Sequence, residues 1–399
     1  ARSSKSKLKD LVKPQAAGVG AAACPARGQP SELQEALRDC FAQLRGDRRP
    51  RGSAATEGGG VPCSCLSHEA SQFAFLRAHW GVSEKAFWSS LCDAPLRGGT
   101  TQASGKSGSI FWFTDDRRLC LKSVTGREMR VLLDSLGAYT QHFRNNGASL
   151  LCRFFGAFEF TVDGSRMPLV VMNNVLRSAP SMEPQVVYDL KGTTEDRWVD
   201  PCLGVVLKDL NFADKVIGLS DAQQRNELLQ TLRKDTRFLR DHRIMDYSIC
   251  LGVHYCSDDV HPSSEQMNPP PTVCSPLAVL KGFEPKFHCT LARDQPAQRV
   301  VYFIGIIDVL QQYDFSKLMA HLAKSLSLGL IHEIDTVPPA YYARRFKTAF
   351  LGKVQTFPEP GDRVARFVQR LQQGMGSGTI PLPTFVVPEV QPLVVRNES

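Results

Sequence analysis

Ionisable residues in apolar or strand-like surroundings are the first candidates for chemistry. Lys122 lies in LCLKSV, Asp246 in RIMDYSICL and Asp308 in FIGIIDVL. Burial of an ammonium or a carboxylate is unfavourable unless a partner, a metal or a ligand compensates. Together with Glu128, which lies in a helical segment, they form the set that a phosphoryl-transfer site needs. Taken singly, each also has a structural explanation, as a surface lysine or as a strand-end aspartate that the backbone satisfies.

A Gly-rich segment upstream offers a place for phosphates. Residues 98–109 read GGTTQASGKSGS. A Walker A loop needs a glycine at position 100, which is Thr100, and a helix should follow, whereas a hairpin is predicted here. The pattern favours a small-residue turn whose backbone N–H groups approach phosphates, with Lys122 as the cation on the next strand.

The protein-kinase motifs are absent. Asp308 is followed by Val309 and Leu310 rather than by Phe-Gly, and Leu251 stands where a metal-binding Asn would follow Asp246. A second cluster, Cys63, Cys65 and His68 in CSCLSH, hints at metal binding. Because a second ligand pair is missing, an ordinary loop is the favoured interpretation.

Hydrophobic periodicity predicts the elements that must position these residues. Helices are expected at 31–44 (with Ser31 as its cap), 73–82, 83–91, 127–144 and 226–244. Strands are expected at 107–116 and 117–124, which form a hairpin, and at 151–162, 167–176, 186–192, 245–255 and 300–310. The order of hairpin, helix and strands indicates an α+β protein rather than a strict βαβ alternation.

Composition divides the chain of 399 residues into three parts. Residues 1–65, rich in Ala, Gly, Arg, Pro and Ser, are expected to be a low-complexity tail. Residues 66–354 are expected to be the globular domain, with a Pro-rich insertion at 256–296, and residues 355–399 an extended tail. Both tails are expected to be disordered.

Charge and cysteine content narrow the classes of partner and compartment. The net charge of +8 favours an anionic partner, either nucleic acid, a membrane surface or a phosphorylated substrate. No apolar run reaches the about 18–20 residues of a membrane-spanning helix, and the first residues lack the apolar core of a secretory signal. Twelve cysteines are too few for a disulfide scaffold, which indicates a reducing compartment. Tyr341 and Tyr342 before Arg344 are a thin basis for nucleic-acid binding, which is not expected.

A basic amphipathic segment points to the membrane surface. In residues 314–326, one helical face is apolar and the other carries Lys317, His321 and Lys324. This pattern is typical of an interfacial helix, and Arg344, Arg345 and Lys347 add cations beyond it. A core helix is the alternative interpretation.

Several sequence blocks together resemble the phosphatidylinositol phosphate kinase family. The most specific are VVYDLKGTTEDRW (186–198), VLKDLNF (206–212), IMDYSICLGVH (244–254), YFIGIIDVLQQYD (302–314) and YYARRF (341–346). SLCDAPL (90–96), SGSIFWFTDDRRLCLKSV (107–124) and VVMNNVL (170–176) also match. The resemblance extends in order over residues 71–353, about 70% of the chain.

The resemblance implies a two-lobed lipid kinase fold that uses ATP and Mg²⁺. An antiparallel N-lobe sheet is expected at about 66–176 and a smaller mixed C-lobe at about 177–354. It implies that Asp246 is the catalytic aspartate, Asp308 the Mg²⁺ ligand and Lys191 a further phosphate contact. The implied ATP-binding residues are Lys122 with Glu128 as its partner, Ser104, Gly105, Ser107 and Gly108 in the turn, and Met172, Asn173 and Asn174 at the adenine hinge. The implied substrate and membrane residues are Arg197, Lys317, Ala320, Lys324, Arg344 and Arg345.

The branch of the family is less sharply marked. Two adjacent lysines are usual in the family's specificity loop, and here they read Lys317-Leu318. Ala320 stands where the 5-kinase branch has Glu, which favours a phosphatidylinositol-5-phosphate 4-kinase. Because the 5-kinase branch is the broader one, we expect phosphorylation of phosphatidylinositol 4-phosphate at the 5-hydroxyl. A catalytically dead membrane scaffold is the third alternative. The resemblance further implies a peripheral location at the cytoplasmic face of the plasma membrane, with a homodimer as an open alternative.

Overall fold

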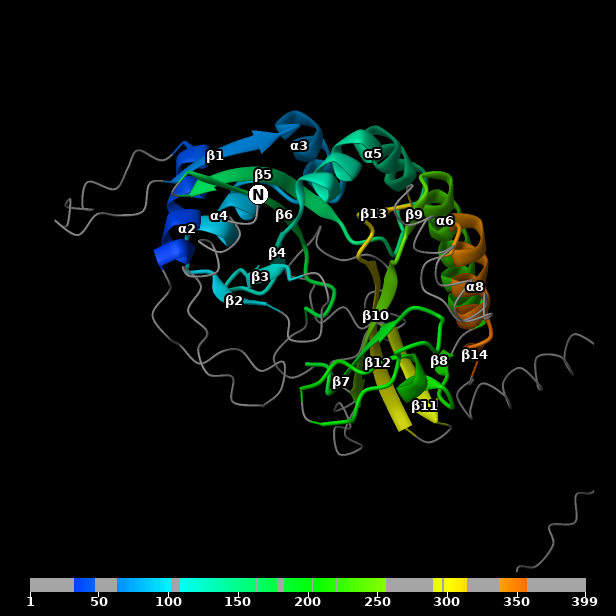
Figure 1. The fold of residues 1–399 in the computed structure, drawn as a ribbon. Coiled ribbons are helices and arrows are strands. Elements are labelled where there is room, and N and C mark those ends of the chain that lie inside the picture. Colours follow the sequence, from blue (N-terminus) through cyan, green and yellow to red (C-terminus); the bar gives the residue numbers. More distant parts are fainter. Residues whose placement is uncertain are drawn as a thin grey trace, which may run out of the picture. The chain divides into compact units, whose positions relative to one another are not determined.

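Two six-stranded sheets carry the functional candidates (Figure 1). This computed structural model describes residues 32–46, 63–101, 108–162, 164–177, 183–202, 204–219, 222–255, 290–295, 298–313 and 337–356. Within them, helices and antiparallel sheets occur together, so the predicted α+β class is confirmed. None of the described helices combines the length and the apolar character needed to cross a bilayer.

The first sheet is antiparallel throughout and has the order β1-β5-β6-β4-β3-β2. Its strands are β1 (Cys63–His68), β2 (Arg97–Thr101), β3 (Ile110–Phe113), β4 (Leu119–Ser123), β5 (Phe154–Val162) and β6 (Ser165–Asn173). The hairpin expected around Asp115 and Asp116 is β3 and β4, in which Phe111 pairs with Lys122. The antiparallel N-lobe sheet is therefore confirmed.

The second sheet is mixed, in the order β14-β8-β11-β12-β10-β7, because β14 and β8 run parallel. Its strands are β7 (Val186–Leu190), β8 (Ile217–Leu219), β10 (Ser248–Tyr255), β11 (Thr290–Gln295), β12 (Gln298–Ile307) and β14 (Val354–Thr356). A two-stranded sheet, β9 (Ile244–Met245) with β13 (Gln311–Gln312), lies beyond the ends of β10 and β12.

Helices cover both sheets. They are α2 (Glu32–Arg45), α3 (Ala70–His79), α4 (Glu84–Cys92), α5 (Gly126–Asn145), α6 (Ala222–Asp241) and α8 (Pro339–Leu351), with the short 3₁₀ helix η2 (Asp209–Phe212). The start of α5 follows from a capping box, in which the Thr125 hydroxyl accepts the Glu128 N–H and the Glu128 carboxylate accepts the Thr125 N–H. Figure 1 shows α6 and α8 side by side along the second sheet.

One helix lies inside the segment that composition assigns to the N-terminal tail, and one strand begins at its end. The buried side chains Leu37 and Phe41 attach α2 to the core, and the Phe41 ring meets the edges of Phe158 and Phe160 at 5.1 and 5.2 Å. CSCLSH is strand β1, paired along its length with β5, rather than a loop. β1 is an edge strand. Its run of small polar residues carries only a weak strand signal, because strands favour β-branched and aromatic residues. Ser31 lies outside the described residues.

Three other boundaries differ from the sequence prediction. Thr290–Gln295, placed in the 256–296 insertion, forms β11 against β12; its sequence TLARDQ has no clear period that would mark it as a strand. Helix α6 begins at Ala222, four residues before the predicted start. It ends at Asp241, because the backbone turns at Arg243, with a φ of 57°. Strand β14 reaches into the C-terminal segment. Residues 256–289 and 357–399 lie outside the described part of the chain.

Leu37→Ala tests whether α2 belongs to the folded core. Leu37 is 0% exposed, so truncation should lower the free energy of unfolding by about 2–5 kcal/mol in urea. The exposed Glu35 on the opposite face of α2 provides the control, and Glu35→Ala should change it by less than about 0.5 kcal/mol. Equal and negligible effects of both substitutions would place α2 outside the cooperative fold.

Candidate active site at the edge of the second sheet

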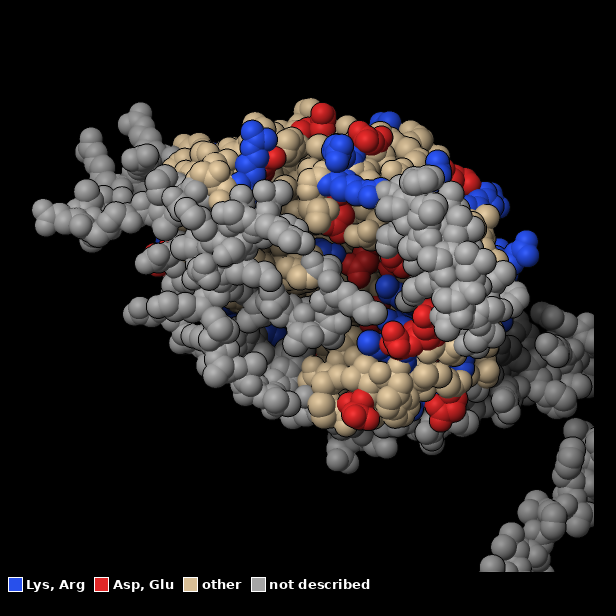
Figure 2. Space-filling model, viewed as in Figure 1, with Lys and Arg blue, Asp and Glu red and all other residues tan. Residues whose placement is uncertain are grey.

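Three strands of the second sheet end at the same edge, which brings the candidate catalytic residues together. Leu190 of β7 pairs with Ile249 of β10, and Ser248 pairs with Ile307 of β12. Lys191 therefore follows β7, Asp246 precedes β10 and Asp308 follows β12 at one edge of the sheet. Figure 2 shows acidic and basic side chains meeting in a recessed region in the middle of this face, near the ends of β10 and β12 in Figure 1.

Both aspartates occupy left-handed backbone conformations. The φ angles are 62° at Asp246 and 60° at Asp308, values that few residues other than glycine adopt. Each residue lies where the chain passes from the large sheet into the small one, since Gln311 pairs with Met245. Such conformations cost about 1–3 kcal/mol and concentrate at functional sites. Aspartate accepts this conformation more readily than most side chains, which suits it to the position.

An ion pair joins the two sheets at this point. The Lys122 Nζ, on β4, donates to Asp308 Oδ1 at 2.6 Å. The Lys122 side chain is 9% exposed, whereas that of Asp308 is 42% exposed. Burial favours the neutral lysine, but Asp308 and Glu128 outweigh it and raise the pKa of Lys122. The lysine is therefore charged, and Asp308 keeps a side open to solvent or to a ligand.

Glu128 does not pair with Lys122, its implied partner, but bonds to Thr125 and Gln311. Its carboxylate caps α5 through the N–H and hydroxyl of Thr125, and it accepts a hydrogen bond from Gln311 Nε2 at 3.0 Å. In this structure Lys122 is paired with Asp308 instead, and Glu128 acts on it only through its charge. The capping box fixes the carboxylate at the helix start, which explains the difference. An ATP-binding role for Glu128 stays a prediction.

Asp209 organises the loop that presents Lys191. Its carboxylate accepts the backbone N–H of Lys191 at 3.0 Å and that of Gly192 at 2.7 Å. Gly192 has a φ of 69°, and a Cβ there would lie 3.0 Å from the Ala349 Cβ on α8. A larger residue would therefore be strained and crowded, and the loop is fixed against α8.

Arg197 supports the same loop through Asp209 and Asp189. Its guanidinium bonds to Asp209 Oδ2 at 2.7 Å and to both the carbonyl and the carboxylate of Asp189. Burial opposes its charge, but the two carboxylates prevail and raise the pKa of Arg197. With 6% of its surface exposed, Arg197 has little to offer a lipid headgroup directly. Its contacts are those of a residue that positions Lys191.

The residues assigned to the adenine hinge lie at the end of β6. The Asn173 N–H donates to the Arg153 carbonyl and the Asn174 N–H to the Arg118 carbonyl, both at 3.0 Å. These two backbone donors are therefore occupied by protein acceptors. Met172 is half-buried in the strand between Cys120 and Phe154. Their contact with adenine stays a prediction.

Helix α8 supports the segment after Asp246, the predicted catalytic aspartate. The Tyr342 hydroxyl donates to the Tyr247 carbonyl at 2.5 Å, and the two rings pack edge to face. The Arg345 guanidinium lies 5.1 Å from the centre of the Tyr342 ring, and Arg344 is exposed. Of the remaining predicted residues, Gly108 is described, with a φ of 62°. Ser104, Gly105, Ser107, Lys317, Ala320 and Lys324 lie outside the described residues.

Two carboxylates that organise the site were not identified from the sequence. Asp209 lies in VLKDLNF, and Asp235 lies on α6 with 0% exposure. Asp235 follows Leu228 by seven residues and precedes Leu239 by four, which is the spacing of the apolar face. A carboxylate on an apolar helix face needs partners, and this signal could have revealed it.

The chemistry of the donors at this edge suits Mg²⁺, which prefers one or two carboxylates and completes its shell with water and phosphate oxygens. Asp308 is partly exposed, and Asp246 is half-buried on the neighbouring strand end. Among the described residues, no group of three or more His, Cys, Asp and Glu side chains could hold a metal by itself. The residues of CSCLSH form no such group among the described residues.

Replacement of Lys122 should remove a pH-dependent part of the stability. Because its pKa is raised in the folded protein, charged Lys122 stabilises the fold below its ordinary value of 10.5, and this contribution is lost as the pH rises through the folded-state pKa. The difference in free energy of unfolding between wild type and Lys122→Met should therefore decline above pH 10.5. Urea unfolding across that range measures it, and a constant difference would contradict the assignment.

Comparison with known proteins agrees with this geometry. Residues 97–277 and 278–352 match the family model described as Phosphatidylinositol-4-phosphate 5-Kinase. This match includes Lys122, Lys191, Asp246 and Asp308. Among the residues placed at the site, the matched range also includes the positioning residues Asp209 and Arg197.

Curated relatives come from both branches of the family. The chain is 30% identical over 309 residues to phosphatidylinositol 4-phosphate 5-kinase type-1 beta of Rattus norvegicus, which covers 69% of this chain and 55% of the relative. It is 32% identical over 293 residues to phosphatidylinositol 4-phosphate 5-kinase-like protein 1 of Homo sapiens (68% and 71%). It is 28% identical over 313 residues to phosphatidylinositol 5-phosphate 4-kinase type-2 gamma of Danio rerio (69% and 74%). The chain thus spans about half the length of the type-1 relative. On the family model and these relatives, the chain belongs to the phosphatidylinositol phosphate kinase family.

Proposed function

We propose that the chain transfers the γ-phosphoryl group of ATP to phosphatidylinositol 4-phosphate at the 5-hydroxyl, which yields phosphatidylinositol 4,5-bisphosphate. The observation that carries the proposal is the ion pair between Lys122 and Asp308, at the sheet edge that also presents Lys191 and Asp246. A buried lysine, a partly exposed carboxylate and a second carboxylate beside it are the parts that phosphoryl transfer requires.

Each residue has a distinct role in the proposed reaction. Asp246 accepts the proton of the attacking hydroxyl. The Lys122 and Lys191 ammonium groups bind phosphate oxygens and neutralise charge that develops in the transition state. Asp308 would hold Mg²⁺, which when bound neutralises further charge on the phosphates. Catalysis then rests on positioning and charge, and the protein forms no covalent intermediate.

Pairing with Asp308 offsets the cost of burying the Lys122 ammonium group. A buried ammonium without an anion would be strongly destabilising, and Asp308 supplies the anion. Nucleotide phosphates can take over this role, because the lysine keeps its charge throughout. The pair therefore keeps the lysine charged and in place before ATP arrives.

The second candidate function is that of a phosphatidylinositol-5-phosphate 4-kinase. Ala320 favours it, and a 4-kinase relative matches at an identity similar to that of the 5-kinases. In either case we infer that the protein acts as a peripheral protein at the cytoplasmic face of the plasma membrane. Exposed Arg344 is available to meet an anionic surface there. A homodimer stays a prediction.

Radiolabelled ATP with Mg²⁺ and three kinds of liposome distinguishes the candidates. The liposomes contain phosphatidylinositol 4-phosphate, the 5-phosphate or unphosphorylated phosphatidylinositol. We expect label in the 4-phosphate sample and none in the unphosphorylated control. Label only in the 5-phosphate sample would establish the 4-kinase reaction. Absence of label in all three, while the protein still sediments with the liposomes, would indicate a catalytically dead scaffold.

Asp308→Asn should abolish turnover and leave liposome binding nearly unchanged. The substitution keeps the shape of the side chain and removes the charge that Lys122 and Mg²⁺ need. Turnover is measured as above and binding by sedimentation with liposomes. Loss of both properties together would show that Asp308 is mainly structural.

Asp209→Asn tests the support of the Lys191 loop. The neutral amide attracts Arg197 and the two backbone N–H groups more weakly than the carboxylate does. Lys191 should therefore lose its fixed position. We expect kcat to fall about tenfold or more, with a smaller change in the KM for ATP. Asp214→Asn, on the exposed surface beyond η2, is the matched control and should leave kcat unchanged. Equal effects of the two substitutions would exclude a positioning role.

A further inference from the structure

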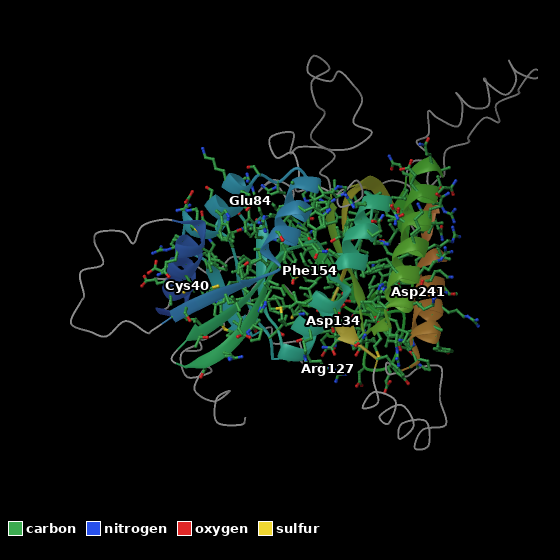
Figure 3. All side chains as sticks on the ribbon, turned by 90° about the horizontal axis from the view of Figure 1, so that it is seen from above. Cys40, Glu84, Arg127, Asp134, Phe154 and Asp241 are labelled. Atoms are coloured by element: carbon green, nitrogen blue, oxygen red, sulfur yellow. The ribbon has the colours of Figure 1, made fainter. Side chains whose placement is uncertain are left out.

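Two thiols from different elements meet on the first sheet, far from the candidate active site in sequence. The Cys40 Sγ, on α2, donates a hydrogen bond to the Cys63 Sγ, on β1, across 2.9 Å. Figure 3 shows the Cys40 side chain on the face of α2 that turns toward the neighbouring strand. Cys40 is 2% exposed and Cys63 is half-buried at the start of an edge strand. An S–S bond is about 2.05 Å long, so a small movement would join the two sulfur atoms.

The surroundings divide the pair into a nucleophile and a resolving thiol. The hydrogen bond that Cys40 donates stabilises the Cys63 thiolate and lowers the pKa of Cys63. The same contact raises the pKa of Cys40, which stays a thiol. Other cysteines of the core differ, because burial raises the pKa of Cys120 and of Cys152 to about 12. A half-buried thiol with a lowered pKa, beside a second thiol within 2.9 Å, is the arrangement that oxidants select.

A third cysteine nearby provides an internal comparison. Cys65 follows Cys63 by two residues on β1, on the same side of the strand. Burial and the charge of Cys63 raise the pKa of Cys65 to about 12. Cys65 therefore shares the local environment but lacks the donated hydrogen bond that activates Cys63.

We propose that Cys40 and Cys63 form a redox modification site, at which a peroxide converts the two thiols into a disulfide between α2 and β1. The Cys63 thiolate attacks one peroxide oxygen, the O–O bond breaks, and a sulfenic acid and hydroxide form. The Cys40 sulfur then attacks the Cys63 sulfur, the S–O bond breaks, and water leaves. The proton released by Cys63 neutralises the hydroxide. Two thiols and one peroxide thus give one disulfide and two waters, and a thiol reductant reverses the change.

The disulfide would fasten α2 to the sheet that carries Lys122. Cys40 and Cys63 are 23 residues apart in sequence, so the bond closes a loop of moderate length in the unfolded chain. Closure of such a loop restricts the unfolded ensemble and favours the folded state. In a reducing compartment, such a bond would form only under oxidative stress. The inference does not depend on the proposed lipid kinase activity.

The test is peroxide treatment of the full chain followed by alkylation and peptide mapping. We expect a reversible Cys40–Cys63 cross-link at peroxide concentrations that leave the exposed Cys202 reduced. The oxidised protein should unfold several degrees higher than the reduced one. A cross-link that joins other cysteines, or oxidation of Cys202 before the pair, would overturn the proposal.

Serine variants assign the roles within the pair. Cys40→Ser should leave a sulfenic acid on Cys63 that a dimedone probe traps, whereas Cys63→Ser should leave Cys40 reduced. Cys65→Ser is the matched control and should form the Cys40–Cys63 cross-link at the wild-type rate. A slower cross-link in Cys65→Ser, or trapping at Cys40 in Cys63→Ser, would refute the assignment.

Discussion

The buried carboxylate of Asp235 constrains how the two sheets meet. It is 0% exposed and accepts hydrogen bonds from the Ser149 hydroxyl and the Leu150 N–H, at 2.8 and 2.7 Å, besides contacting the His142 ring. A buried carboxylate without these partners would be strongly unfavourable, so the segment at 149–150 must stay against α6. The Leu150 carbonyl then accepts the Ile306 N–H at 2.7 Å. Through this contact the constraint reaches β12, which ends directly before Asp308.

The ion pair of Lys122 depends on this connection. Lys122 comes from the first sheet and Asp308 from the second, so the 2.6 Å contact exists only while β12 is held beside the segment between α5 and β5. Cys152 strengthens that junction, because its N–H donates to the Ile306 carbonyl at 2.9 Å. The ion pair at the site thus depends on how the two sheets pack together. A change in either would alter the charge balance at this sheet edge.

Catalysis and lipid selection are separate demands on this fold. Under the proposed function, the sheet edge with Asp246 and Asp308 carries out phosphoryl transfer, whose requirements are the same whichever inositol hydroxyl attacks. Both 5-kinase and 4-kinase relatives accordingly match the chain at 28–32% identity. Selection between two isomeric headgroups requires contacts that differ between them. Under the proposed function, the segment that carries Ala320 would make those contacts, and its sequence can diverge without change to the proposed catalytic edge.

Local patterns predicted the parts of the structure that local chemistry determines. The hairpin with Lys122 follows from alternation, and the helix with Glu128 from its apolar period, whereas its Thr125 cap was found only in the structure. The two aspartates stood out because each lies beside an apolar strand. The partners of these residues could not be predicted in the same way. Asp235 meets the Leu150 N–H across 85 residues of sequence, and Lys122 meets Asp308 across 186. Such pairs are set by strand order and register, and periodicity predicts only that a buried charge must find a partner.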